Sequence, residues 1–288
     1  MTDIRSYIVA IQSQLESAYP AEEAEALAWW IAEELSGQSR TELLFGCKDT
    51  TFFQNTQEIV SRLLHFEPIQ YIFGHTLWCG LDLKLTPATL IPRPETAELV
   101  KLIADCSARM DDCKVLDIGT GSGCIALALK KLHPEWQVTG MDISAEAIEV
   151  AKENARRNKL EADFQIADIF HSPFPVFHSY DIVVSNPPYI CEKEKSTMRA
   201  NVLHFEPSTA LFVPDDDPLL FYRRIAEQFA LSYSEKCRKK AYLFFEINEA
   251  YSDETRQLLE SAGYSDIRIY QDMYGKPRFV SAEMKKCT

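Results

Sequence analysis

The sequence predicts an α/β protein with a mostly parallel sheet, a small all-helical domain before it and an antiparallel hairpin at its end. Three observations lead to this prediction. The first 66 residues have helical periodicity throughout, and from Thr96 onward short β-prone runs alternate with helical stretches. Strands that alternate with helices favour parallel pairing with right-handed crossovers. The last two β-prone runs instead follow each other around a short turn, which indicates an antiparallel pair.

The helical prediction for residues 1–66 depends on composition and spacing. Residues 3–17 and 51–65 place apolar side chains at helical spacing, and residues 21–35 are mostly strong helix formers that follow Pro20. The segment holds ten acidic and four basic residues, a net charge of −6. We expect a helical recognition domain that contacts another protein; the alternative is a purely structural cap.

Residues 67–90 change in character and predict a β-hairpin that links two domains. Two β-prone runs, Tyr71–Gly74 and Leu81–Leu85, flank the short stretch Trp78–Gly80, which contains a turn-forming glycine. The remaining residues, 91–288, are then expected to form one catalytic domain.

The predicted sheet is assembled from runs in this last part. Four short β-prone runs are expected as parallel strands, namely Lys114–Ile118, Val138–Met141, Phe164–Ala167 and Ile182–Ser185. Helices are expected at Cys124–Leu132, at Ala145–Asn158 with Ser144 as its N-cap, and at Pro218–Ala230. A buried strand is expected at Tyr242–Ile247, and the closing hairpin at Ile267–Tyr270 and Arg278–Ala282.

Composition excludes several classes of protein. The formal charge of −13 argues against binding that depends on non-specific phosphate contacts, so we expect no direct nucleic-acid partner. No apolar run approaches the ~18–20 residues that cross a bilayer, and the first residues lack the pattern of a signal peptide. The eight cysteines are scattered, which favours free thiols and a cytoplasmic location. The six histidines form no ligand cluster, so we expect no metal, and a monomer is the default.

Glycine is scarce, yet three of the ten glycines lie together at Gly119, Gly121 and Gly123, between a predicted strand and a predicted helix. Glycines at such a turn let backbone N–H groups approach a ligand that a Cβ atom would keep away. Asp142 follows Gly123 by nineteen residues, at the end of the next predicted strand, where its carboxylate can accept both hydroxyls of a ribose. The alternative is a tight turn without a ligand.

The spacing Gly-x-Gly-x-Gly, with Asp117 two residues before it, resembles the S-adenosyl-L-methionine loop of class I methyltransferases, which have a Rossmann-like fold. This resemblance implies that S-adenosyl-L-methionine is the cofactor and S-adenosyl-L-homocysteine the product. It also implies that an acidic residue and the residue after it lie at the adenine, here Asp168 and Ile169. For Asp168 the alternative is a loop or N-cap acid. The cofactor-binding residues implied are Gly119, Thr120, Gly121, Ser122, Gly123, Asp142, Asp168, Ile169 and Asn186.

The segment Asn186-Pro187-Pro188-Tyr189 follows the fourth predicted strand, at the carboxyl edge of the sheet, where open α/β sheets bind ligands. The two prolines remove backbone donors, so the Asn186 side-chain oxygen and a proline carbonyl remain as acceptors. Acceptors suit a planar –NH₂ group, on which Tyr189 can stack. We therefore expect all four residues to bind substrate, with Asn186, Pro187 and Tyr189 as the catalytic residues; the alternative is a rigid loop without a catalytic role.

An amide or aryl amine is a poor nucleophile because its lone pair is delocalised. Acceptors that hold both N–H groups position the nitrogen toward the sulfonium methyl group, and this alignment is worth several kcal/mol. The motif alone leaves three substrates open: adenine in DNA, guanine in ribosomal RNA and a protein glutamine amide. A nucleic-acid enzyme would need a basic groove. A non-enzymatic binding protein is a further alternative, against which the intact motifs argue.

Five motifs in one order then make the chain similar to the peptide chain release factor glutamine N5-methyltransferases, the PrmC/HemK family. The motifs are Glu67–Gly74, Pro87–Val100, Val115–Leu129, Asp181–Ile190 and Phe205–Leu211. The resemblance implies methylation of the glutamine in the Gly-Gly-Gln motif of class I release factors, and so a role in translation termination. It also implies that the release factor is the partner.

Three charged residues lie within these motifs without an assigned role. Arg93 and Glu95 belong to a loop that approaches the active site in the family, so we expect either a direct role or an ion pair that locks the linker. Glu206 matches a motif in the same way. The chain departs from the family at Ile169, often an aromatic residue, and at residues 213–218, where a glycine-rich stretch is common.

Overall fold

The computed structural model describes residues 4–46, 55–107, 110, 112–171, 180–234 and 240–284. The chain divides into two compact units. One contains residues 1–74 with 199–205, and the other contains residues 75–198 with 206–288. Within the described ranges, every helix is too short or too polar to span a bilayer.

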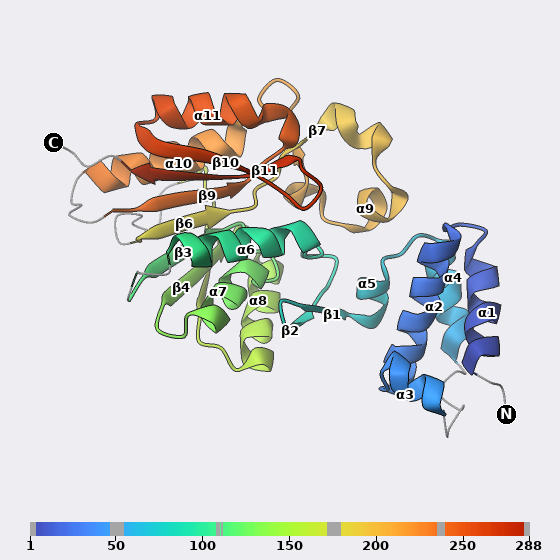
Figure 1. Cartoon of the computed structure of the whole chain (residues 1–288). Coiled ribbons are helices and arrows are strands. Elements are labelled where there is room, and N and C mark those ends of the chain that lie inside the picture. Colours follow the sequence, from blue (N-terminus) through green and yellow to red (C-terminus); the bar gives the residue numbers. More distant parts are fainter. Residues whose placement is uncertain are drawn as a thin grey trace. The chain divides into compact units, whose positions relative to one another are not determined.

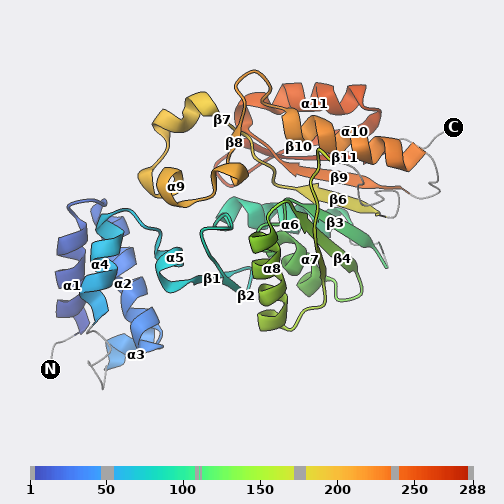
Figure 2. The same cartoon turned by 180° about the vertical axis from the view of Figure 1, so that it is seen from behind.

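The first unit is helical (Figure 2). Its helices are α1 (Ile4–Leu15), α2 (Ala21–Ser36), α3 (Arg40–Phe45), α4 (Thr56–Leu64), α5 (Ile69–Phe73) and α9 (Ala200–Phe205). The expected helices at 3–17 and 21–35 are present, and the third begins at Thr56; residues 51–54 lie outside the described residues. The helical prediction for residues 1–66 includes α3 but did not give its bounds, although Ser39 and Glu42 form a capping box at its start, a pattern that the sequence displays.

Helix α9 is separated from the rest of its unit in sequence. The chain on both sides of residues 199–205 belongs to the sheet unit, whereas these residues belong to the helical unit. Arg199 lies 3.4 Å from Glu23 of α2, an exposed ion pair of the kind that contributes little stability. The sequence showed no signal for this insertion. The predicted domain ranges 1–66, 67–90 and 91–288 stay a proposal.

The hairpin of the linker was predicted in the right place but with the wrong first strand. Its strands are β1 (His75–Trp78) and β2 (Leu81–Lys84), which pair antiparallel. The run Tyr71–Gly74 is instead the end of α5, which follows Pro68 and ends at Gly74 in the left-handed conformation. The three β-prone side chains of this run were too few to establish a period, so the flanking proline and glycine decided the structure.

A seven-stranded sheet forms the centre of the second unit, in the order β10-β11-β9-β6-β3-β4-β5. The strands are β3 (Lys114–Ile118), β4 (Gln137–Asp142), β5 (Asp163–Ile166), β6 (Ile182–Ser185), β9 (Tyr242–Glu246), β10 (Tyr264–Gln271) and β11 (Pro277–Met284). The first five are parallel, and β11 pairs antiparallel with both β9 and β10. This confirms the predicted fold class, including the closing antiparallel hairpin.

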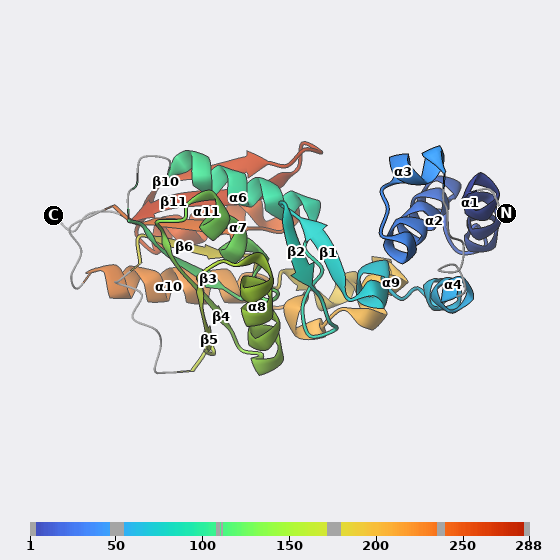
Figure 3. The ribbon, with the colours of Figure 1, turned by 90° about the horizontal axis from the view of Figure 1, so that it is seen from below.

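Helices cover both faces of this sheet (Figures 1 and 3). The helices are α6 (Pro94–Cys106), α7 (Cys124–Leu132), α8 (Ala145–Asn158), α10 (Leu220–Ser234) and α11 (Ser252–Ser261). Two apolar clusters hold the layers together. One joins α6, α7 and α8 to the sheet around Leu127 and Trp136, and the other joins α10 and α11 to it around Tyr222 and Leu259. Ser144 caps α8 as predicted, since its hydroxyl accepts from Ala147 N at 3.1 Å.

Helix α8 also completes the outer edge of the hairpin strand β2. The side-chain amides of Asn154 and Asn158 each accept from and donate to one backbone position of β2, at Lys84 and Asp82, over 2.6–3.1 Å. The fully buried Asn154 also donates to Ser122 O at 2.9 Å. One helix therefore satisfies a strand edge and contacts the glycine loop at the same time.

Candidate active site

A cavity of about 450 Å³ opens at the carboxyl ends of the parallel strands in the second unit. Its walls come from the loops after β3, β4, β5 and β6, from residues 88–96, and from residues 207–212. The cavity thus brings together residues 119–122 of the glycine loop, Asp142, Asp168, Ile169 and the residues from Asn186 to Pro188. The predicted cofactor residue Gly123 is not among the lining residues, and a Cβ atom there would meet the Ala151 and Phe164 side chains at 3.2 Å. Most of the lining is apolar, which is typical of a cofactor or substrate pocket.

The glycine loop has the backbone that its sequence requires. Gly119 and Gly121 have φ angles of +70° and +55°, a conformation in which other residues are strained. A Cβ atom added at either position would meet no atom within 4 Å, so it would project into open space. Because both glycines line the cavity, this space is available to a ligand that contacts backbone.

Asp142 supports the loop from the end of β4. Its carboxylate accepts from Gly121 N and from Ser144 N, both at 2.9 Å. Each carboxylate oxygen has a second lone pair, so these bonds are compatible with hydroxyl groups of a ligand. The expected contact with a ribose remains a prediction, and the structure adds a role in fixing the loop.

Asp117 is fully buried beside the same loop. One of its oxygens, Oδ2, accepts from the Thr120 hydroxyl at 2.6 Å and from Ala126 N at 3.2 Å, whereas Oδ1 has no hydrogen-bond partner. Burial raises the pKa of Asp117 to about 7, against the lowering effect of these two bonds. A buried carboxylate that is only half satisfied is typical of functional sites.

Asp168 and Ile169 lie on the cavity wall after β5. The Asp168 carboxylate accepts from Phe170 N at 2.8 Å and lies 2.5 Å from His171 Nδ1. The backbone bond from Phe170 is the main cause that lowers the pKa of Asp168, and the His171 bond adds to it. Ile169 is buried in the core below, and its carbonyl accepts from Arg224 Nε at 2.9 Å. Their contact with adenine stays a prediction.

The structure places the four residues of the Asn-Pro-Pro-Tyr segment in two environments. Asn186, Pro187 and Pro188 line the cavity, whereas Tyr189 packs against the core of α10 and α11. The Tyr189 hydroxyl donates to Glu246 at 3.2 Å, and burial raises the pKa of that hydroxyl. Stacking of Tyr189 on the substrate therefore remains a prediction, beside a structural role that the sequence did not indicate.

Arg93 joins two walls of the cavity. It lies 2.6 Å from Glu206, whose side chain is 1% exposed and also accepts from Ile91 N at 3.2 Å. The expected alternative of an ion pair at Arg93 is thus observed with Glu206 rather than with Glu95. The pair connects the loop before α6 to the segment that begins at Glu206 and continues along the cavity.

Two buried residues near the motif were not predicted. Thr96, in the first turn of α6, and Glu246, the last residue of β9, are joined by a 2.8 Å hydrogen bond. The signal for Glu246 was a single acidic residue that ends the apolar run of β9. An acid in such a run is rarely buried unless it has a partner.

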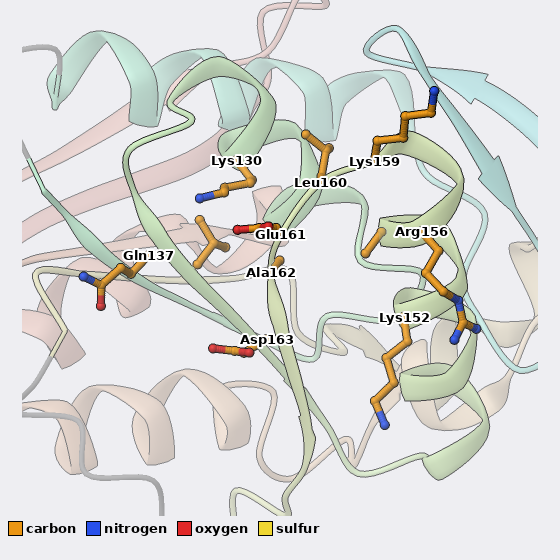
Figure 4. A pocket seen from close by; sticks show the side chains of 11 residues that line it. Lys130, Gln137, Lys152, Arg156, Lys159, Leu160, Glu161, Ala162 and Asp163 are labelled. Carbon is orange, nitrogen blue, oxygen red and sulfur yellow. The ribbon is translucent and has the colours of Figure 1, made fainter.

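A second hollow lies at the opposite ends of the strands, near the starts of β4 and β5 and the end of α8 (Figure 4). Figure 4 shows that the side chains of Lys130, Lys152 and Lys159 extend in different directions. Lys130 donates to two backbone carbonyls, and Lys152 and Arg156 pair with neighbouring acids of α8. The hollow therefore lacks convergent groups, and among the described residues no cluster of three metal-ligating side chains occurs.

Two family models match the chain. The family model of the PrmC N-terminal domain matches residues 8–74, and that of the methyltransferase small domain matches residues 98–211. The chain is similar to a solved human methyltransferase 10 domain containing protein, with a TM-score of 0.51 and 17% identity over 72% of this chain and 90% of that one. This likeness shows a shared fold.

Two curated relatives match along nearly their whole length. A release factor glutamine methyltransferase of Bacteroides thetaiotaomicron is 42% identical, over 98% of this chain and 99% of that protein. One of Flavobacterium psychrophilum is 35% identical over the same shares. With such identities along both chains, the protein belongs to the family of release factor glutamine methyltransferases.

Proposed function

We propose that the protein transfers the methyl group of S-adenosyl-L-methionine to the side-chain amide nitrogen of the glutamine in the Gly-Gly-Gln motif of class I release factors. One observation carries this proposal for a chain of this family. The open glycine loop and the acceptor residues Asn186–Pro188 line one cavity, so a methyl donor and a planar amide would meet there. We also propose that the protein is a monomer and that it acts in the cytoplasm. The five described free cysteines support the proposed location.

The residues of the cavity fit this cofactor. The space in front of Gly119 and Gly121 accepts a ligand that touches backbone, and Asp142 and Asp168 offer carboxylate oxygens on neighbouring loops. Ile169, which is largely buried, contributes an apolar side chain to the cavity wall, where a ring could pack. When bound, S-adenosyl-L-methionine supplies an electrophilic methyl group on a sulfonium, and no metal is needed for that chemistry.

The acceptor residues would prepare the amide nitrogen. Asn186 Oδ1 and the Pro187 carbonyl accept the two N–H groups, which fixes the nitrogen opposite the methyl carbon. The bound donor would supply the methyl group and its sulfur would keep the electron pair of the broken sulfur–carbon bond, while the amide nitrogen would lose one N–H proton to water. The chain needs no nucleophile of its own, since the substrate nitrogen is the nucleophile. Alignment and desolvation of that nitrogen would therefore lower the barrier to transfer.

The charges of the cavity favour a protein substrate over a nucleic acid. Among its described lining residues the basic side chains are Arg93, which is paired with Glu206, and His171, which contacts Asp168. A nucleic-acid enzyme would need unpaired cations for the phosphates. The net charge of −13 argues in the same direction.

Transfer from a labelled methyl donor to different acceptors tests the proposal. The protein is incubated with donor and, in separate reactions, with a class I release factor, DNA and ribosomal RNA. We expect label in the release factor alone. Labelled nucleic acid beside an unlabelled release factor would refute the proposed substrate.

The variant Asn186→Ala tests the catalytic assignment. It removes the side-chain acceptor but leaves the glycine loop intact, so we expect methyl transfer to be lost while donor binding stays largely unchanged. Calorimetry of donor binding and transfer to the release factor give the two readouts. Turnover equal to that of the unaltered protein would refute the role of Asn186.

A further inference from the structure

A chain of hydrogen bonds runs from the core of the second unit to the substrate-facing amide. We infer that Glu246 is a positioning residue, which acts through Thr96 to fix which atom of the Asn186 amide faces the cavity. This inference deepens the proposed function and depends on it for the identity of the substrate. Neither Glu246 nor its bond to Thr96 was foreseen from the motifs.

The strand register brings these residues together. Ser185 at the end of β6 pairs with Phe245 of β9, so the next residues, Asn186 and Glu246, lie side by side at this end of the sheet. Thr96 reaches the same place from the first turn of α6. Glu246 is 1% exposed and Thr96 2% exposed, so neither carboxylate nor hydroxyl can exchange its partner for bulk water.

The direction of each bond follows from the number of hydrogens. The Thr96 hydroxyl donates its single hydrogen to Glu246 Oε2 at 2.8 Å. Thr96 Oγ1 can then only accept, and Asn186 Nδ2 lies 3.4 Å from it as the donor. The other end of this amide is Oδ1, which is thereby directed to the remaining side of Asn186, a residue that lines the cavity.

A reversed Asn186 amide would be penalised. Its Oδ1 atom would face Thr96 Oγ1, an oxygen without a free hydrogen, while Nδ2 would present donors to the substrate. A donor surface would repel an –NH₂ group and suit a carbonyl instead. The buried acid therefore sets the polarity of the site, and with it the preference for an amide nitrogen.

The same carboxylate holds the other end of the motif. The Tyr189 hydroxyl donates to Glu246 Oε1 at 3.2 Å, and Asn248 Nδ2 donates to the Tyr189 carbonyl at 3.1 Å. Two hydroxyl donors on one carboxylate are the pattern expected for its ionised form. Burial raises the pKa of Glu246, whereas the Thr96 bond, the charge of Arg278 and the Tyr189 bond oppose that rise.

The test compares two isosteric substitutions and their combination. Glu246→Gln replaces one of the two acceptor oxygens by an –NH₂ donor, so the Thr96 and Tyr189 hydroxyls can no longer both donate to this side chain. Thr96→Val removes the relay hydroxyl. For each we expect kcat to fall about 10- to 100-fold, with the donor KM nearly unchanged, because the amide is misoriented but the glycine loop is intact. The double variant should lose no more than the worse single variant, since both act through one chain.

Two further variants separate positioning from folding. Thr96→Ser keeps the hydroxyl and should recover most of the kcat that Thr96→Val loses. Thr255→Val removes another fully buried hydroxyl of the same unit, which donates to Tyr251 O at 2.7 Å, and should leave kcat unchanged. Additive losses in the double variant, or equal losses in Thr96→Ser and Thr96→Val, would overturn the inference.

A spectroscopic readout makes the inference independent of the substrate. The side-chain ¹⁵N–¹H resonances of Asn186, assigned by their absence in Asn186→Ala, should shift in both Glu246→Gln and Thr96→Val and stay in place in Thr255→Val. Unshifted resonances in the first two variants would overturn the inference. Absence of release-factor methylation by the unaltered protein would instead refute the proposed function.

Discussion

At the scale of single residues, Asp117 is a residue of the site whose burial lowers the free energy of unfolding at neutral pH. Its buried carboxylate has one oxygen without a partner, and burial raises its pKa from 3.8 to about 7. The folded state therefore holds this proton more tightly than the unfolded state does. The stability that Asp117 contributes is fully present below the unfolded pKa and is lost as the pH rises through about 7.

Asp117→Asn should therefore stabilise the protein at neutral pH. Its free energy of unfolding should exceed that of the unaltered protein by an amount that grows by roughly 1.4 kcal/mol per pH unit between the two pKa values and then levels off. Urea unfolding over a series of pH values measures this. Asp168→Asn is the control of opposite sign, because the pKa of Asp168 is lowered. A difference independent of pH would contradict the burial argument.

Gly119 allows a test of the open space at the loop. In Gly119→Ala, the left-handed backbone costs about 1 kcal/mol, and the new methyl group enters the proposed cofactor site. We expect donor affinity, measured by calorimetry, to fall roughly tenfold or more. Gly275→Ala is the matched control, since its φ of +77° imposes the same strain away from the cavity. Equal donor affinities in the two variants would exclude the site.

At the scale of elements, α8 stabilises the site through asparagine side chains. Asn154 and Asn158 replace a neighbouring strand along the outer edge of β2. The two residues differ in burial and in one contact. Asn154 is fully buried, and it also donates to the Ser122 carbonyl of the glycine loop. The linker hairpin and the loop thus depend on one side chain.

Asn154→Ala should lower the free energy of unfolding by about 2–3 kcal/mol, because it leaves buried backbone groups without partners. It should also weaken donor binding, whereas Asn158→Ala, which does not contact the loop, should affect stability to a smaller extent and leave donor binding intact. Denaturant unfolding and calorimetry distinguish the two effects. Donor binding that is equally weak in both variants would count against a role for the Ser122 contact.

Local patterns were enough to predict several elements at their observed bounds. The strands at 114–118 and 182–185 and the helix at 124–132 combine a clear period with a nearby glycine, proline or cap. Residues 71–73 were assigned wrongly because a run of three has no period, and the caps of α5 decided its conformation. Helix boundaries depend on caps more than on propensity.

The site was predictable where a contiguous motif, or a side chain at the end of a predicted strand, marks its residues. The glycine loop and the segment from Asn186 to Pro188 were found because each is a contiguous motif that ends a strand. The contacts of Thr96 with Glu246 and Asn186 span 150 and 90 residues, respectively. No local pattern encodes such contacts, because strand register and helix packing create them.

At the scale of the whole molecule, charge is the main property that a partner would meet. The chain carries a net charge of −13, and −6 of this lies in residues 1–66. An acidic surface accelerates and strengthens association with a basic partner, and dissolved salt screens this attraction.

Binding of the release factor should therefore weaken as the ionic strength rises. We expect the Kd, measured by calorimetry at about 0.05 M and about 0.5 M salt, to increase with salt. Binding of the small methyl donor in its cavity serves as the control and should change far less. A release-factor Kd that is the same at low and high salt would contradict a role for the acidic domain in docking.

Peptide mass mapping of a class I release factor after reaction with the protein and S-adenosyl-L-methionine tests the central claim most directly. The cavity, its acceptor residues and the family of the chain predict one added methyl group, located on the side-chain nitrogen of the glutamine in the Gly-Gly-Gln peptide. A release factor in which that glutamine is replaced by glutamate should gain none. A methyl group on any other residue, or an unmodified peptide after full donor turnover, would contradict the account.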